Sequence, residues 1–186
     1  ARQDIPPISA DFTFFGGIYR DVWLTAVPKQ HFHLTNYGSE GIFISTPQVS
    51  EEKGTILIRG EIKNDAEQKA SLELEHIIYN PDGSIAQTQK QSIQIKGGEL
   101  YSFRTETEAP HLYRVESILR DKKTKAILDH SNHHTGFRWF SFDGKTGFSL
   151  NGKPYKLRGI CRHQDQKTIG VALTDEMHRR DMKLMK

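Results

Sequence analysis

Histidine side chains can bind metals, transfer protons or bond to hydroxyl groups, and this sequence places two pairs of them close together. His31 and His33 are two residues apart, and His133 is followed directly by His134. On an extended strand His31 and His33 would share one face. Neither pair is accompanied by a third ligand at a recognisable spacing, which a zinc site would need. We therefore expect surface or interdomain histidines here, and the sequence predicts no metal site.

A second group of reactive residue types follows an apolar run near the end of the sequence, from Cys161 to Asp165. Cys161 is the single cysteine, so no internal disulfide can form, and we expect its thiol to be buried at the end of a strand. His163 could donate to or accept from a hydroxyl group, or it could be a loop histidine that packs or faces water. Asp165 could bind a hydroxyl or orient its neighbour, or it could be a solvated carboxylate.

The elements that would position these residues differ along the chain, and residues 29–137 predict a β-sandwich. Short runs alternate between apolar and polar residues, which places one set of side chains on a buried face. The apolar members of these runs are Ile56, Ile58, Ile62, Leu72, Leu74, Ile93, Ile95, Tyr113 and Val115. Turn-forming residues separate the runs, at 80–83, 96–98 and 121–124. About seven short strands without a helical pattern between them indicate an immunoglobulin-like β-sandwich, without the cysteine pair of antibody domains.

Residues 138–160 predict a hairpin followed by a further strand. Phe148 and Leu150 lead into Asn151-Gly152, which is a strong signal for a tight hairpin turn. The run from Tyr155 to Ile160 then predicts a second strand. The first 28 residues end in a run of β-branched and aromatic residues that also predicts a strand.

The last part of the sequence predicts a loop and a helix. The loop runs from Cys161 to Leu173, and Thr174 is a favourable N-cap. The acidic Asp175 and Glu176 suit the positive end of a helix dipole. Residues 138–186 therefore predict a strand, a loop and a helix in that order.

Charge and hydropathy exclude two classes of partner. The 26 basic residues and 23 acidic residues give a net charge of +3, and the two signs are interspersed along the sequence. A nucleic-acid-binding protein shows a dense basic footprint instead. No stretch approaches the roughly 18 uncharged apolar residues of a membrane-spanning helix. We therefore expect neither a nucleic acid nor a membrane as partner, while the cytoplasm and the periplasm both stay open as compartments.

Four short segments carry a family resemblance. Residues 17–22 read Gly-Ile-Tyr-Arg-Asp-Val, and residues 136–138 read Gly-Phe-Arg. Residues 148–165 run from Phe-Ser-Leu-Asn-Gly-Lys-Pro to Arg-His-Gln-Asp, and residues 181–186 read Asp-Met-Lys-Leu-Met-Lys. In this order and spacing the sequence resembles glycoside hydrolase family 2, the family of β-galactosidases, β-glucuronidases and β-mannosidases.

The resemblance implies three pieces of a larger enzyme. Residues 1–28 are expected to end a sugar-binding jelly-roll domain, and residues 29–137 to form an immunoglobulin-like β-sandwich. Residues 138–186 are expected to begin a truncated (β/α)8 TIM barrel. The fold class that we predict is thus mainly β, a sandwich with flanking pieces of a jelly roll and of the first β/α unit of a TIM barrel.

The resemblance also implies a substrate site in the loop after residue 160. Active-site groups of a TIM barrel lie at the C-terminal ends of its strands. His163 matches the family's histidine that contacts the sugar, and Asp165 is a second candidate for substrate binding in the intact enzyme. Arg162 is expected to pair with an acid elsewhere in the barrel, outside this sequence.

No catalytic residue is expected within the 186 residues. The family is a retaining one, in which one glutamate is the general acid/base and another is the nucleophile. The resemblance implies that both come from later barrel strands, beyond Lys186. We therefore expect the chain by itself to lack hydrolase activity.

The function that follows is that of a fragment of a retaining, exo-acting β-glycosidase acting on a β-linked sugar, with β-galactosidase as the expected activity. The alternatives are a β-glucuronidase, a β-mannosidase, or a non-enzymatic β-sandwich that serves as a binding module. No cofactor is expected, although a divalent metal in the intact barrel stays open, as does a homo-oligomer.

Overall fold

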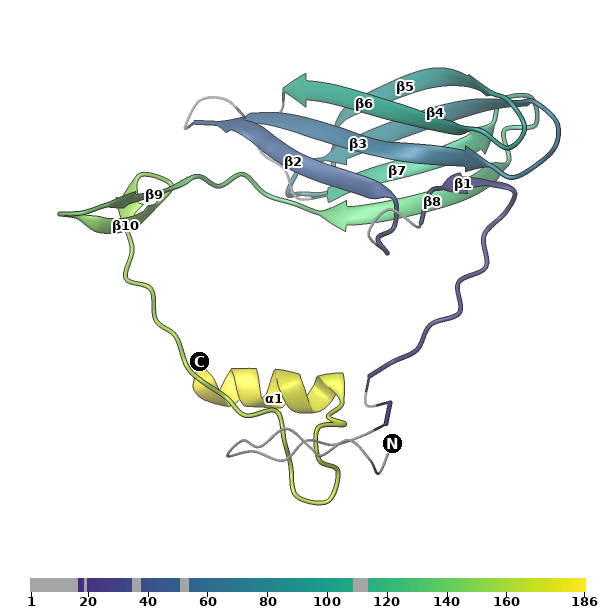
Figure 1. Ribbon diagram of the computed structural model, residues 1–186. Helices are drawn as coiled ribbons and strands as arrows, with labels where there is room; N and C mark the ends of the chain where they lie inside the picture. The colour runs from purple at the N-terminus through teal and green to yellow at the C-terminus, as the bar shows by residue number, and fades with distance from the viewer. Residues whose placement is uncertain (1–16, 19, 35–37, 51–53, 109–113) are drawn as a thin grey trace. The chain divides into compact units, whose positions relative to one another are not determined.

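The computed structural model describes residues 17, 18, 20–34, 38–50, 54–108 and 114–186 (Figure 1). Tyr19 and Tyr113, which the sequence patterns include, lie outside the described residues. The chain divides into two compact units. The larger unit spans residues 26–157, and the smaller combines residues 158–186 with the part of the chain before residue 26.

The first sheet of the larger unit is built around its longest strand, β3 (Gly54–Asn64). On one side, β3 pairs along most of its length with β6 (Leu100–Glu108). On the other side, it pairs first with β2 (Ile42–Val49) and then, through its last three residues, with β1 (Gln30–Phe32). All of these pairings are antiparallel, so two short strands share one edge of a long one.

The second sheet also has four antiparallel strands, in the order β5-β4-β7-β8. These are β4 (Ala70–Tyr79), β5 (Ile85–Ile95), β7 (Arg114–Asp121) and β8 (Ile127–His134). The two sheets lie face to face as a sandwich (Figure 1). The edge strands β1 and β8 are tied together, because the Asp129 carboxylate accepts a hydrogen bond of 2.8 Å from the backbone N–H of Phe32.

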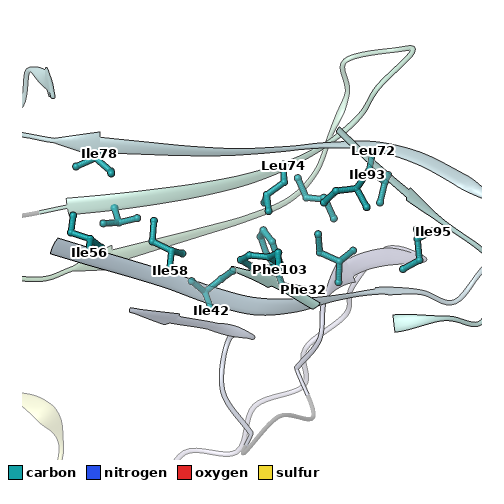
Figure 2. Close-up of a cluster of buried hydrophobic side chains, with 13 residues drawn as sticks. Phe32, Ile42, Ile56, Ile58, Leu72, Leu74, Ile78, Ile93, Ile95 and Phe103 are labelled. Carbon is teal, nitrogen blue, oxygen red and sulfur yellow. The ribbon is translucent and has the colours of Figure 1, made fainter. Parts of the chain in front are cut away.

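The core lies between the two sheets and is built from alternate residues of the strands (Figure 2). The buried cluster consists of Phe32, Ile42, Ile56, Ile58, Ile62, Leu72, Leu74, Ile78, Ile93, Ile95, Phe103, Val115 and Leu119. Each of these side chains contributes roughly 1.5–3 kcal/mol by leaving water. The alternation that the sequence shows in these runs is confirmed, and so is a mainly β fold with a β-sandwich.

One buried amide closes the end of the sandwich where β3 turns into β4. Asn64 is fully buried, and its side-chain oxygen accepts from the amide of Gln30 and from the backbone N–H of Ala66. Its side-chain nitrogen donates to the backbone carbonyls of Gln68, Ile95 and Lys96. Because every polar group of this amide has a partner, its burial carries no desolvation penalty that is left uncompensated.

The predicted turns form, and one of them shows why its residue types were informative. The carboxylate of Asp121 accepts from the backbone N–H groups of Lys123 and Thr124, at 3.0 and 2.7 Å. The bonds from Thr124 hold the pKa of this carboxyl below its usual value. Aspartate is common at such turn positions because its carboxylate accepts hydrogen bonds from the backbone of the same turn.

Where the chain leaves the sandwich, the ring of Phe137 packs against Gly54. A Cβ atom on Gly54 would come within 2.6 Å of the Phe137 ring, so the ring occupies the place of a side chain. Phe137 also packs against the buried cluster. The middle residue of the Gly136-Phe137-Arg138 segment is therefore half-buried against the core.

A small three-stranded sheet follows, made of β9 (Phe140–Asp143), β10 (Gly147–Leu150) and β11 (Lys153–Pro154). The predicted hairpin turn at Asn151-Gly152 is confirmed. Both residues have positive φ, 49° and 72°, which is the conformation that a two-residue turn of this type requires. The rings of Phe140, Phe142, Phe148 and Tyr155 gather on this sheet, with centroids 5.1 to 6.3 Å apart.

Candidate functional site

The predicted strand from Tyr155 to Ile160 does not form in the described part of the chain. Beyond β11 these residues have no regular secondary structure. A strand is stabilised by hydrogen bonds to a neighbouring strand, and the pairings of the structure provide no partner here. For the same reason the expected burial of Cys161 is wrong, because its thiol is exposed.

The predicted helix does form, as α1 (Asp175–Met185). Thr174 is its N-cap, with extended backbone angles and a hydroxyl that accepts from the backbone N–H of Met177. Asp175 and Glu176 lie in the first turn and Lys183 in the last, so both ends complement the helix dipole. This helix has no fully buried residue.

The loop between residues 161 and 173 contains a tight turn that gives it local order. Gln166 and Gly170 exchange two backbone hydrogen bonds of 2.9 Å, in the pattern of an antiparallel bridge. Thr168, at the tip, has a φ of 85°, and Gly170 has one of 59°. Backbone hydrogen bonds of this turn therefore fix the chain directly after the segment that carries His163 and Asp165.

The N-terminal side of the same segment is held by Arg162. Its guanidinium donates to one carboxylate oxygen of Asp181 from two nitrogens, Nε at 2.8 Å and one terminal nitrogen. Its third nitrogen lies 3.1 Å from Nδ1 of His178. The expectation that Arg162 pairs with an acid outside this sequence is wrong, because its partner is in α1.

The spacing of His178 and Asp181 could have shown that they share one face of a helix, but not that Arg162 contacts them. They lie three residues apart on a helix, and residues at this spacing share one face. The guanidinium of Arg162 reaches that face across the loop that precedes α1. On the same helix the apolar side chain of Leu184 is 75% exposed.

The two residues predicted to bind substrate lie together in the held segment. His163 and Asp165 are both exposed. They are separated by one residue, between the Arg162 contact and the turn that begins at Gln166. An exposed imidazole and an exposed carboxylate in one short segment can donate to and accept from the hydroxyl groups of a polar ligand.

A hollow of about 690 Å³ lies beside this segment within the smaller unit. It is lined by Arg20, Asp21, Trp23, Gln164, Thr174 and His178, among others. Its lining does not include His163 or Asp165. Trp23 is 82% exposed, so in the described part of the chain its indole packs into no core.

The histidine pairs of the larger unit form no metal site. His31 is buried, and its Nδ1 lies 2.9 Å from the carbonyl oxygen of Pro28, while Nδ1 of His33 lies 3.1 Å from the Glu61 carboxylate. Nε2 of His133 lies 2.7 Å from the hydroxyl of Ser131. Among the described residues there is no group of three or more His, Cys, Asp or Glu side chains that could hold a metal ion. In that same part of the chain, α1 is the one helix, and it is too short and too polar to cross a membrane.

Comparison with known families gives a match to most of the sandwich. The model of the family described as "Glycosyl hydrolases family 2" matches residues 40–138. This range runs from just before β2 to the residue after Phe137.

Two relatives and one solved structure match the whole chain. A β-glucuronidase from Bacteroides fragilis is 30% identical over 100% of this chain and 28% of its own length. A β-galactosidase from Thermoanaerobacter pseudethanolicus is also 30% identical, over 100% of this chain and 25% of its own length. The solved structure of Bacteroides uniformis β-glucuronidase 2, covalently bound to cyclophellitol-6-carboxylate aziridine, is 68% identical with a TM-score of 0.91, over 100% of this chain and 23% of that one. The chain thus spans about a quarter of the length of these proteins.

Proposed function

The chain belongs to glycosyl hydrolases family 2, and from this premise we propose that the whole protein hydrolyses β-glycosidic bonds, with β-glucuronides as its preferred substrates. The observation that carries the preference is the 68% identity, over the entire chain, to a β-glucuronidase. The identity to the β-galactosidase is less than half as high. The expected β-galactosidase activity is retained as the second candidate, because that relative also matches along the whole chain.

The proposed mechanism is a retaining one. The similar Bacteroides uniformis β-glucuronidase 2 is covalently bound to a carboxylated aziridine. A covalent adduct with an electrophilic sugar analogue requires a nucleophile from the enzyme. A retaining glycosidase uses such a nucleophile, a carboxylate about 5 Å from the acid/base residue. This comparison supports the same chemistry for the present protein. Both carboxylates are proposed to lie outside these 186 residues.

We propose that His163 and Asp165 contribute to substrate binding. An imidazole can bond to a sugar hydroxyl as donor or acceptor, and an aspartate can accept from a second hydroxyl. Both side chains are exposed in one short segment that is held at each end. Such contacts accelerate the reaction when they are stronger in the transition state than in the ground state.

The remaining parts of the chain are proposed to connect the domains of the enzyme. We assign residues 29–137 to an immunoglobulin-like linking sandwich, residues 1–28 to the end of a jelly-roll domain, and residues 138–186 to the start of a TIM barrel. The support for the first assignment is the family match to residues 40–138 and the two packed sheets. The loop followed by α1 supports the last.

Substrate preference is tested with the full-length protein and three nitrophenyl glycosides. We expect kcat/KM to be highest for the β-glucuronide, and lower for the β-galactoside and the β-mannoside. A highest value for the β-galactoside would overturn the preference and leave the glycosidase proposal standing. Absence of turnover with all three would contradict both.

The role of His163 is tested by His163→Ala in the same protein. Loss of one hydrogen bond that strengthens in the transition state lowers kcat/KM by about 100-fold. His134→Ala is the matched control, since His134 is an exposed histidine on β8 of the larger unit. Equal activity of the two variants would exclude the proposed sugar contact.

A further inference from the structure

The segment that carries His163 and Asp165 has an anchor on each side, and the two anchors are different in kind. After the segment, Gln166 and Gly170 close a backbone turn. Before it, the anchor is the side chain of Arg162, whose bonds all lead to α1. The segment itself is exposed and contains no regular secondary structure. Its position therefore depends on a side-chain contact at one end.

The geometry points to a positioning role, and we infer that Arg162 holds the His163 segment in place for the substrate through Asp181 and His178. This inference rests on the proposed contact between His163 and the sugar. Arg162 is the residue directly before His163, so a displacement of its Cα moves the histidine with it. Misplacing a reacting or binding group by about 1 Å can lower a rate by about 100-fold.

The contact is better protected from solvent than an ordinary surface ion pair. The side chain of Arg162 is 18% exposed and that of Asp181 is 37% exposed. On the same helix, Arg179 and Asp175 form a pair whose side chains are 74% and 85% exposed. Exposed pairs contribute little, because solvent screens them and their side chains lose entropy. Because it is less exposed, the Arg162–Asp181 pair can hold the backbone at Arg162 in place better than the Arg179–Asp175 pair could hold its own.

Arginine at this position makes contacts that a lysine side chain could not make. A guanidinium presents five N–H donors in a rigid plane, and here it reaches Asp181 and His178 at once. Since a guanidinium can only donate, Nδ1 of His178 must carry a lone pair. Its proton, in the neutral ring, is then on Nε2. A lysine would keep the charge but could not span both partners with a planar fork.

The test uses the full-length protein and the Asp181→Ala variant. We expect kcat/KM for the β-glucuronide to fall by about 10- to 100-fold, with an unchanged thermal unfolding midpoint. Arg162→Lys is expected to fall between this variant and the wild type. Asp175→Ala, which breaks the exposed pair on the same helix, is the control and is expected to keep its kcat/KM within about twofold.

A double-mutant cycle separates positioning from a merely structural effect. If Asp181 acts through the His163 segment, then adding Asp181→Ala to His163→Ala causes little further loss, because the group being positioned is gone. Additive losses would overturn the inference, and so would full activity of Asp181→Ala. Should Asp181→Ala lower the unfolding midpoint, the same cycle is run with Asp181→Asn, which keeps the shape of the side chain.

The failure of the inference can be told apart from the failure of the proposed function. If His163→Ala retains wild-type activity, the sugar contact itself is wrong, and a positioning role toward it is wrong as well. If His163→Ala loses activity but Asp181→Ala does not, only the positioning role is wrong.

Discussion

Different physical interactions stabilise each of the two units of this chain. The sandwich has a buried cluster of thirteen apolar side chains between its sheets. In the smaller unit, by contrast, α1 has no buried residue, and its loop is fixed by one guanidinium and one backbone turn. Apolar burial scales with area and is non-directional, whereas a hydrogen-bonded ion contact is directional. The first kind of interaction supplies stability, and the second fixes where a side chain lies.

The largest effect is expected from opening the sandwich core with Leu74→Ala. Leu74 is 1% exposed on β4, so the change removes buried methyl groups and leaves a cavity. We expect the free energy of unfolding to fall by about 3–4 kcal/mol, measured by urea denaturation of the full chain. Leu100→Ala is the matched control, because Leu100 is 46% exposed at the start of β6. Equal losses in the two variants would contradict the view that stability resides between the sheets.

The buried His76 should make the sandwich sensitive to acid. Its ring is 2% exposed and lies beside Phe103, with Nδ1 2.9 Å from the hydroxyl of Ser117. Burial lowers the pKa of His76 from 6.5 to about 4, because it disfavours the charged ring. Between pH 6.5 and about 4, His76 therefore binds a proton in the unfolded chain but not in the folded chain. The contribution to stability is complete above pH 6.5 and is lost as the pH falls toward 4.

The substitution His76→Leu removes this titration. Between pH 7 and pH 4.5 the wild type should lose about 2 kcal/mol more of its unfolding free energy than the variant does. Urea denaturation at the two pH values measures the difference. His134→Leu, at an exposed position, should keep the acid sensitivity of the wild type. An unchanged pH dependence in His76→Leu would show that His76 is not the group responsible.

The smallest effect is expected at the helix cap of the smaller unit. Thr174→Ala removes the hydroxyl that accepts from Met177, at a local cost of about 1 kcal/mol. Amide hydrogen exchange in the first turn of α1 should become faster, while the urea midpoint of the sandwich stays the same. Arg180→Ala, in the exposed middle of the helix, should leave that exchange unaffected. A shift of the sandwich midpoint by Thr174→Ala would mean that the two units unfold together.

The sequence predicted the sandwich well because its signal is local and repeated. Alternation within each run identified inward residues such as Ile58 and Leu74, and the turns followed from Asp121 and Asn151-Gly152. The inward position of His76 was missed, because a polar residue in an apolar series is read as an interruption. Asn64 was missed because its partners come from three separate places in the chain, at the start of β1, in the turn after β3 and at the end of β5.

The candidate site was harder to predict than the fold. His163 and Asp165 were identified through a family resemblance, and their role in binding remains a prediction. The contact between Arg162 and Asp181 joins residues 19 apart in sequence, across a loop whose path no periodicity reveals. The predicted strand before the site failed because a strand needs a partner, and no short run of residues shows whether that partner is present.

The ring of Phe137 against Gly54 has a practical consequence for anyone who wishes to produce the sandwich as a separate module. The last strand of the sandwich ends at His134, and a truncation placed there would look harmless on a diagram of the strands. It would discard an aromatic ring that fills the space above a glycine and contacts the buried cluster. The module boundary therefore belongs after residue 137, and the neighbouring Arg138 is a safer place to stop than the end of the final strand.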